Sequence, residues 1–86
     1  MIQKILGYNF EVDKNGDKHS TKFGSNISSA LKKMTFDSFL IATYNLQIDD
    51  RMTYELKESF SFEEINQLSE AEILQEIENR IIKKYN

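Results

Sequence analysis

Three groups of side chains have residue types that could bind a metal ion or transfer a proton. In the first, Asp13, Asn15 and Asp17 alternate like the first ligands of a calcium-binding loop. Such a loop also needs Gly at its sixth position and a bidentate Glu at its twelfth. In this chain Gly16 falls at the fourth position and Gly24 at the twelfth. Because the bidentate carboxylate is missing, a hairpin turn explains these residues better than a calcium site does.

The second group is Glu55 and Lys57, which follow Asp49 and Asp50 in a way similar to the acid and Glu-x-Lys arrangement of metal-dependent nucleases. In an extended strand, Asp50 and Glu55 are about 16 Å apart, too far to share one metal ion. A pattern of charges on the polar face of a strand explains Glu55 and Lys57 equally well. We therefore expect no nuclease activity.

The third candidate is His19, the only histidine in the chain. A general base needs a partner and a pocket, and its neighbour Ser20 points to the opposite face if this segment is a strand. The chain has no Cys, only three Gly, and no nucleophile-elbow, Walker or dinucleotide-binding motif. The sequence therefore predicts a protein that is not an enzyme and that uses no cofactor and no metal ion.

The elements that carry these residues begin with a β-hairpin and a short helix. Apolar residues alternate with polar ones over 6–12, which predicts a strand whose buried face is formed by Leu6, Tyr8, Phe10 and Val12. Asn15-Gly16 predicts the turn. A weaker edge strand follows at about 18–24, with Phe23 as its apolar anchor. Ser25 or Asn26 then caps a helix whose apolar face is Ile27, Ala30, Leu31 and Met34.

The middle of the chain predicts a second hairpin. Residues 36–48 fit a central strand, and a continuation of the preceding helix over 27–47 is the alternative. Strict alternation over 51–60 favours the strand, because this second strand needs a neighbour. A tight turn at Asp49-Asp50 would join the two.

The C-terminal third predicts two helices. Ser61 and Ser69 each begin a Ser-x-x-Glu capping box, which opens a short helix at about 62–68 and a longer one at about 70–85. The longer helix has an apolar stripe at Ile73, Ile77, Ile81 and Tyr85, widened by Leu74 and Ile82. Residues 1–86 thus predict one α+β domain of order ββαββαα, with a small antiparallel sheet of about four strands and helices packed on one face.

Charge is unevenly distributed along the chain, although the formal net charge is only −3. Residues 1–48 carry a net +2, whereas 49–78 contain ten acidic residues and only Arg51 and Lys57 as bases, a net −8. The ordinary interpretation is a solvated helix face. The functional interpretation is a surface that imitates a phosphate backbone and occupies the nucleic-acid-binding groove of another protein.

On this basis the sequence favours a non-enzymatic protein-binding or regulatory module with a basic, nucleic-acid-handling partner. The expected contact residues are acidic: Asp49, Asp50, Glu55, Glu58, Glu63 and Glu64. The residue usage, rich in Ile, Lys and Asn and without Pro, indicates an AT-rich genome such as that of a low-GC bacterium or its phages. Anti-defence proteins, including inhibitors of CRISPR nucleases, share this general profile. The finer hypothesis is therefore an inhibitor from a phage or mobile element.

Two other functions stay open at this point. One is nucleic-acid binding through the basic 14–33 region, which holds Lys14, Lys18, Lys22, Lys32 and Lys33 and would bind in a strongly salt-dependent way. The other is a structural or assembly protein that forms oligomers through an apolar patch. The absence of Cys fits a cytoplasmic location, and because no run approaches about 20 apolar residues we expect no membrane insertion.

Overall fold

The computed structural model of the chain describes residues 4–14 and 20–85, except for the side chain of residue 85. Within this part the elements are β1 (Lys4–Lys14), β2 (Thr21–Gly24), α1 (Ile27–Lys32), β3 (Ser38–Asp49), β4 (Met52–Ser61), α2 (Phe62–Ile65) and α3 (Glu70–Tyr85). The predicted α+β fold of order ββαββαα is confirmed. The predicted Asn15-Gly16 turn, Lys18 and His19 lie outside the described residues.

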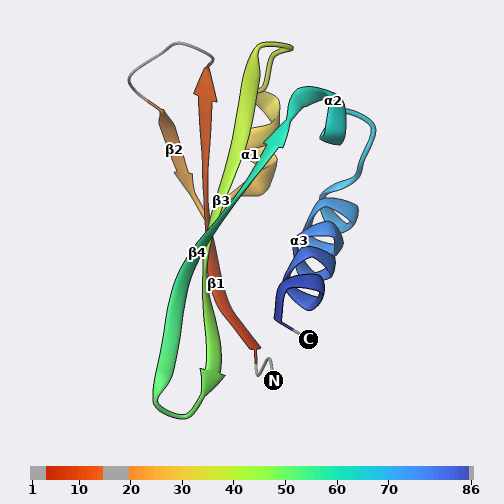
Figure 1. Cartoon of the computed structure of the whole chain (residues 1–86). Coiled ribbons are helices and arrows are strands. Elements are labelled where there is room, and N and C mark those ends of the chain that lie inside the picture. Colours follow the sequence, from red (N-terminus) through yellow and green to blue (C-terminus); the bar gives the residue numbers. More distant parts are fainter. Residues whose placement is uncertain (1–3, 15–19, 86) are drawn as a thin grey trace.

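The four strands form one antiparallel sheet in the order β2-β1-β3-β4. Figure 1 shows the helices on one side of this sheet, while the other side carries no helix. Residues 36–48 belong largely to β3, so the strand interpretation of that segment is confirmed. β4 and β2 are the two outermost strands, and β2 covers only part of β1.

The hydrophobic core lies between the sheet and the helices. Along β3 every second residue from Ser38 to Leu46 is buried, because alternate side chains of a strand point to one face. These side chains meet the stripe of α3, where Ile73, Ile77 and Ile81 are all buried. Aromatic rings on the same face of the sheet contact one another, with Tyr8 stacked on Phe10 at 5.7 Å between ring centroids. The predicted helix stripe is therefore a core surface.

Leu6 is a correction to the predicted strand pattern. It was expected on the buried face together with Tyr8, yet its side chain is 50% exposed. The register of β1 against β3 shifts between Ile5 and Gly7, so that Ile5 lies opposite the buried Leu46. Such a bulge places one extra residue in the strand and reverses the faces beyond it. Ile5, not Leu6, is therefore the apolar side chain that packs against the core.

The helices begin at the predicted caps but differ in length from the prediction. The side chain of Asn26 accepts a hydrogen bond from the Ser29 N–H and caps α1. Ser61 and Glu64 form a complete capping box for α2, which ends at Ile65, three residues earlier than expected. The predicted long helix is α3. α2 is a single helical turn. Because so short a helix gains little stability from its own hydrogen bonds, it depends on its cap.

Candidate functional site

The most tightly organised polar group in the described chain surrounds Glu58 of β4. The side chain of Glu58 is only 7% exposed, on the face of the sheet that packs against the helices. Its carboxylate accepts a hydrogen bond from the Tyr44 hydroxyl at 3.2 Å and from Lys84 Nζ at 3.0 Å. Arg80 lies 3.6 Å from the second carboxylate oxygen. A buried carboxylate needs such partners, because an unpaired charge in the core is strongly unfavourable.

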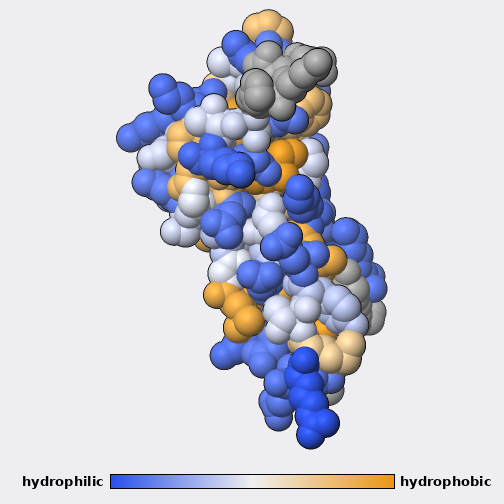
Figure 2. All heavy atoms as spheres, turned by 90° about the vertical axis from the view of Figure 1, so that its left-hand side faces the viewer, coloured by the Kyte–Doolittle hydropathy of each residue, from blue (hydrophilic) through white to orange (hydrophobic). Residues whose placement is uncertain are grey.

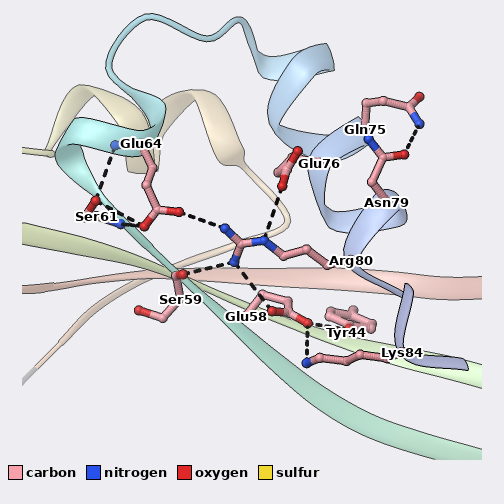
Figure 3. A network of polar contacts seen from close by, with 10 residues as sticks. All are labelled: Tyr44, Glu58, Ser59, Ser61, Glu64, Gln75, Glu76, Asn79, Arg80 and Lys84. Carbon is pink, nitrogen blue, oxygen red and sulfur yellow. Dashed lines mark hydrogen bonds and ion pairs between the residues drawn. The ribbon is translucent and has the colours of Figure 1, made fainter. Parts of the chain in front are cut away.

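Arg80 extends this group into the Glu58–Arg80 network shown in Figure 3. The guanidinium of Arg80 pairs with Glu64 at 2.8 Å and with Glu76 at 3.5 Å. It also donates to the Ser59 carbonyl at 3.3 Å, and it lies 4.1 Å from the centroid of the Phe60 ring. One side chain of α3 thus contacts β4 and α2 at once. The planar guanidinium provides enough donors for these contacts.

The charged groups of this network are paired with one another and with the backbone, as expected of contacts that hold elements of the fold together. The Ser61 backbone N–H holds the pKa of the Glu64 carboxyl below its usual value, with help from the Ser61 hydroxyl and Arg80 and against the effect of partial burial. In the described residues no buried side-chain nitrogen or oxygen lacks a hydrogen-bond partner. The buried polar atoms of the network are thus paired within the fold, and the network joins α3 to β4 and α2.

The six acidic residues expected to bind a partner lie in different places. Glu58 and Glu64 are brought together by Arg80. Asp49 accepts hydrogen bonds from the backbone N–H groups of Arg51 and Met52 and so closes the turn between β3 and β4. Three of the six expected contact residues thus have a role within the fold.

The other three expected residues are exposed and make no ion pair within the described chain: Asp50, Glu55 and Glu63. Asp50 is in the turn before β4, and Glu63 is in α2 after it. β4 has ten residues, so these two ends are about 33 Å apart. Glu55 points to the helix-free face, whereas Glu58 points to the core. The structure therefore does not gather the six residues into one surface.

The helix-free face of the sheet is mostly hydrophilic, as Figure 2 shows. A shallow hollow of about 420 Å³ crosses this face. Its charged lining residues come from three strands and balance one another: Glu11, Lys22, Glu55 and Lys57. No group of three or more His, Cys, Asp or Glu suited to a metal ion occurs among the described residues. The hollow is thus neither strongly acidic nor strongly basic.

The lysines of the alternative nucleic-acid surface are exposed where they are described, namely Lys14, Lys22, Lys32 and Lys33. The aromatic residues that could stack on bases are not available to them. Phe10 is 3% exposed and Tyr8 packs beside it in the core, where burial, together with the charge of Glu78, raises the pKa of its hydroxyl. The aromatic face of the sheet is therefore core, as the sequence favoured.

Phe36 is an exposed residue that the sequence pattern did not single out. Its side chain is 86% exposed in the turn before β3. This turn is closed by hydrogen bonds from the Ser38 N–H to the Thr35 carbonyl at 2.9 Å and from the Thr35 N–H to the Ser38 hydroxyl at 3.2 Å. The Thr35 hydroxyl also donates to Asp37, which lowers the pKa of that carboxyl. The signal in the sequence is the clustering of three hydrogen-bonding side chains around one aromatic residue.

Comparisons with profiles of protein families, with curated protein sequences and with solved structures give no match to this chain. None of the helices in the described residues has the length and apolar character needed to cross a bilayer.

Proposed function

We propose that this protein is a non-enzymatic binding module that contacts a basic, nucleic-acid-handling protein through its exposed carboxylates. The observation that carries the proposal is the charge of segment 49–78, where ten acids stand against Arg51 and Lys57 as the only bases. Five exposed acids of this segment enter neither a side-chain hydrogen bond nor an ion pair in the described residues: Asp50, Glu55, Glu63, Glu70 and Glu78. Unpaired surface charges of one sign attract and orient a partner of the opposite sign.

Two further features support protein binding over chemistry. The buried carboxylate of Glu58 is held within the fold by Tyr44, Lys84 and Arg80. Phe36 adds an exposed aromatic ring held by a closed turn, and aromatic side chains of this kind anchor many protein interfaces. The finer proposal is that the protein is an inhibitor from a phage or mobile element, which competes with nucleic acid for its partner.

Affinity capture with charge-neutralised variants tests this proposal. The chain is immobilised and exposed to nuclease-treated lysate of a low-GC bacterium, and bound proteins are identified by mass spectrometry. The test variant is Asp50→Asn/Glu63→Gln/Glu70→Gln, which removes three exposed negative charges with little change in shape. The control is Lys22→Gln/Lys32→Gln/Lys33→Gln, which removes three exposed positive charges.

We expect one dominant basic partner that the wild type and the lysine variant retain and that the acidic variant loses. Duplex DNA added to the column should also release this partner, because we propose that DNA and this chain occupy the same groove of the partner. A partner that the acidic variant retains, or that binds DNA and this chain together, would contradict the proposal.

A further inference from the structure

β4 is an outermost strand that, among the described residues, has no strand beside its second edge, and near its end the Arg80 guanidinium donates to the Ser59 carbonyl at 3.3 Å. It pairs with β3 over Met52–Ser61, and no other strand in the described residues pairs with it. On an outermost strand every second residue directs its N–H and C=O away from the sheet. The side chains along this edge are also accessible, since Thr53, Tyr54, Glu55 and Lys57 are all exposed.

We propose that β4 pairs with β4 of a second copy of this chain, antiparallel about a two-fold axis at Leu56, so that two four-stranded sheets join into one of eight strands. This proposal shares only Glu55 with the exposed acids on which the proposed function depends. The neutralised residues Asp50, Glu63 and Glu70 lie outside the paired segment, so the two proposals are tested separately.

The geometry of strand pairing limits which registers are possible. In a two-fold antiparallel pair, residues whose N–H and C=O point away from their own sheet must lie opposite residues of the same kind in the other copy. These residues are every second one along the strand. The residue numbers of two opposite residues therefore add up to an even number. The axis therefore lies at a residue. With the axis at Glu55, that carboxylate would meet its own copy, and with the axis at Lys57, two ammonium groups would meet. Like charges directly opposite each other destabilise a strand pair.

The register centred on Leu56 is the one that the charges favour. It places Glu55 opposite Lys57 of the second copy and, by symmetry, Lys57 opposite the second copy's Glu55. Both side chains project from the helix-free face, so two ion pairs form side by side there. On the helix side, Leu56 meets its own copy at the axis. An opposite-charge pair across two strands is a favourable contact.

The same residues act against pairing with unrelated strands. A Lys in the middle of an edge strand and a charged residue that points inward are features that discourage pairing between edges. β4 has both, in Lys57 and the buried Glu58. An apolar strand laid on this edge would leave Glu55 and Lys57 without partners. A second copy of β4 supplies the opposite charge at each position, and the edge is therefore selective for itself.

Sedimentation equilibrium of the whole chain tests the pairing through charge exchange. The monomer mass is 10.1 kDa, and we expect the wild type to approach twice this mass as its concentration rises. Glu55→Lys and Lys57→Glu each place like charges in opposition twice, so each should raise the dissociation constant at least about tenfold. Both residues are exposed, and unchanged far-UV circular dichroism would show that each variant is folded.

The rescue experiments distinguish this register from a general charge effect. Mixing the two single variants should restore the dimer as a heterodimer, and the double variant Glu55→Lys/Lys57→Glu should associate like the wild type. A wild type that stays monomeric at the highest concentration would overturn the proposal. So would single variants that associate as well as the wild type, or a double variant that stays monomeric.

A cross-link gives a second readout of the axis. Because the chain has no Cys, Leu56→Cys introduces one thiol, which the register places within disulfide distance of its copy, about 4.5–5.5 Å between Cα atoms. Thr53→Cys is the matched control on the same strand, since in this register its thiol lies about 20 Å from its copy. Under mild oxidation Leu56→Cys should form covalent dimers much faster than Thr53→Cys. Equal rates, or a faster reaction of the control, would overturn the register.

Discussion

Besides the contact of Lys84 with Glu58, α3 is joined to the rest of the polar structure through Arg80. Arg80 lies between the carboxylates of Glu58, Glu64 and Glu76 and against the ring of Phe60. Glu58 is the most buried of these acids. Removing Arg80 would leave that buried carboxylate with fewer partners, and the cost of an unsatisfied buried charge exceeds that of a lost surface ion pair.

A double-mutant cycle measures this coupling. Arg80→Met keeps the aliphatic packing and should lower the free energy of unfolding by about 2 kcal/mol. In a Glu58→Gln background the same change should cost about 1 kcal/mol less, because the buried charge is gone. Lys83→Met, on an exposed lysine of the same helix, is the control and should change stability by no more than about 0.5 kcal/mol. Strictly additive effects would show that Arg80 and Glu58 are not coupled.

The sequence contains a signal for the face of Glu58, although we expected it among the exposed contact residues, and no signal for its partners. Alternation over β4 placed it beside Leu56 and Phe60, on the apolar face, and this was a signal that its role is structural. Arg80 and Lys84 lie more than twenty residues away along the chain, and no local pattern connects them to β4. Charge counting grouped Glu58 with exposed acids because it takes no account of the direction of each side chain.

At the scale of the element, two capping boxes place Glu64 and Glu72 in similar surroundings. Glu64 accepts from the Ser61 N–H at 3.0 Å, and Glu72 accepts from the Ser69 N–H at 3.0 Å. These backbone bonds are the main reason that the pKa of each carboxyl lies below its usual value. The two boxes were readable from the sequence, because both partners of each box lie within four residues.

The lowered pKa values predict a dependence of stability on pH. A carboxyl whose pKa is lower in the folded than in the unfolded chain stabilises the fold above the unfolded value of about 4.3, and this contribution is lost as the pH falls through the folded value. Stability should therefore decrease on acidification from about pH 5 towards pH 3. In Glu64→Gln/Glu72→Gln the decrease should be smaller. Urea titrations at several pH values measure it, and identical pH profiles for both proteins would contradict the assignment.

At the scale of the whole molecule, the sheet is covered by helices on one face and is mostly hydrophilic, with apolar patches, on the other (Figures 1 and 2). This arrangement and the order of elements could be predicted, because strand alternation, helix periodicity and caps are local signals. The strand order could not be predicted, since it depends on which edges meet after folding. The open edge of β4, on which the proposed dimer depends, became visible only with that order.

The bulge at Leu6 has a consequence for changes in the length of the chain. β1 pairs with both β2 and β3, so a residue inserted or deleted within it would exchange the faces of all side chains on one side of the change. Leu6 is the exception, because removing it brings Ile5 opposite Leu46 and Gly7 opposite Asn45 without a gap. We expect deletion of Leu6 to keep a cooperative thermal transition and deletion of Asn9 to abolish it, as circular dichroism would show. Position 6 is thus where this strand can lose one residue and keep its side chains on the same faces.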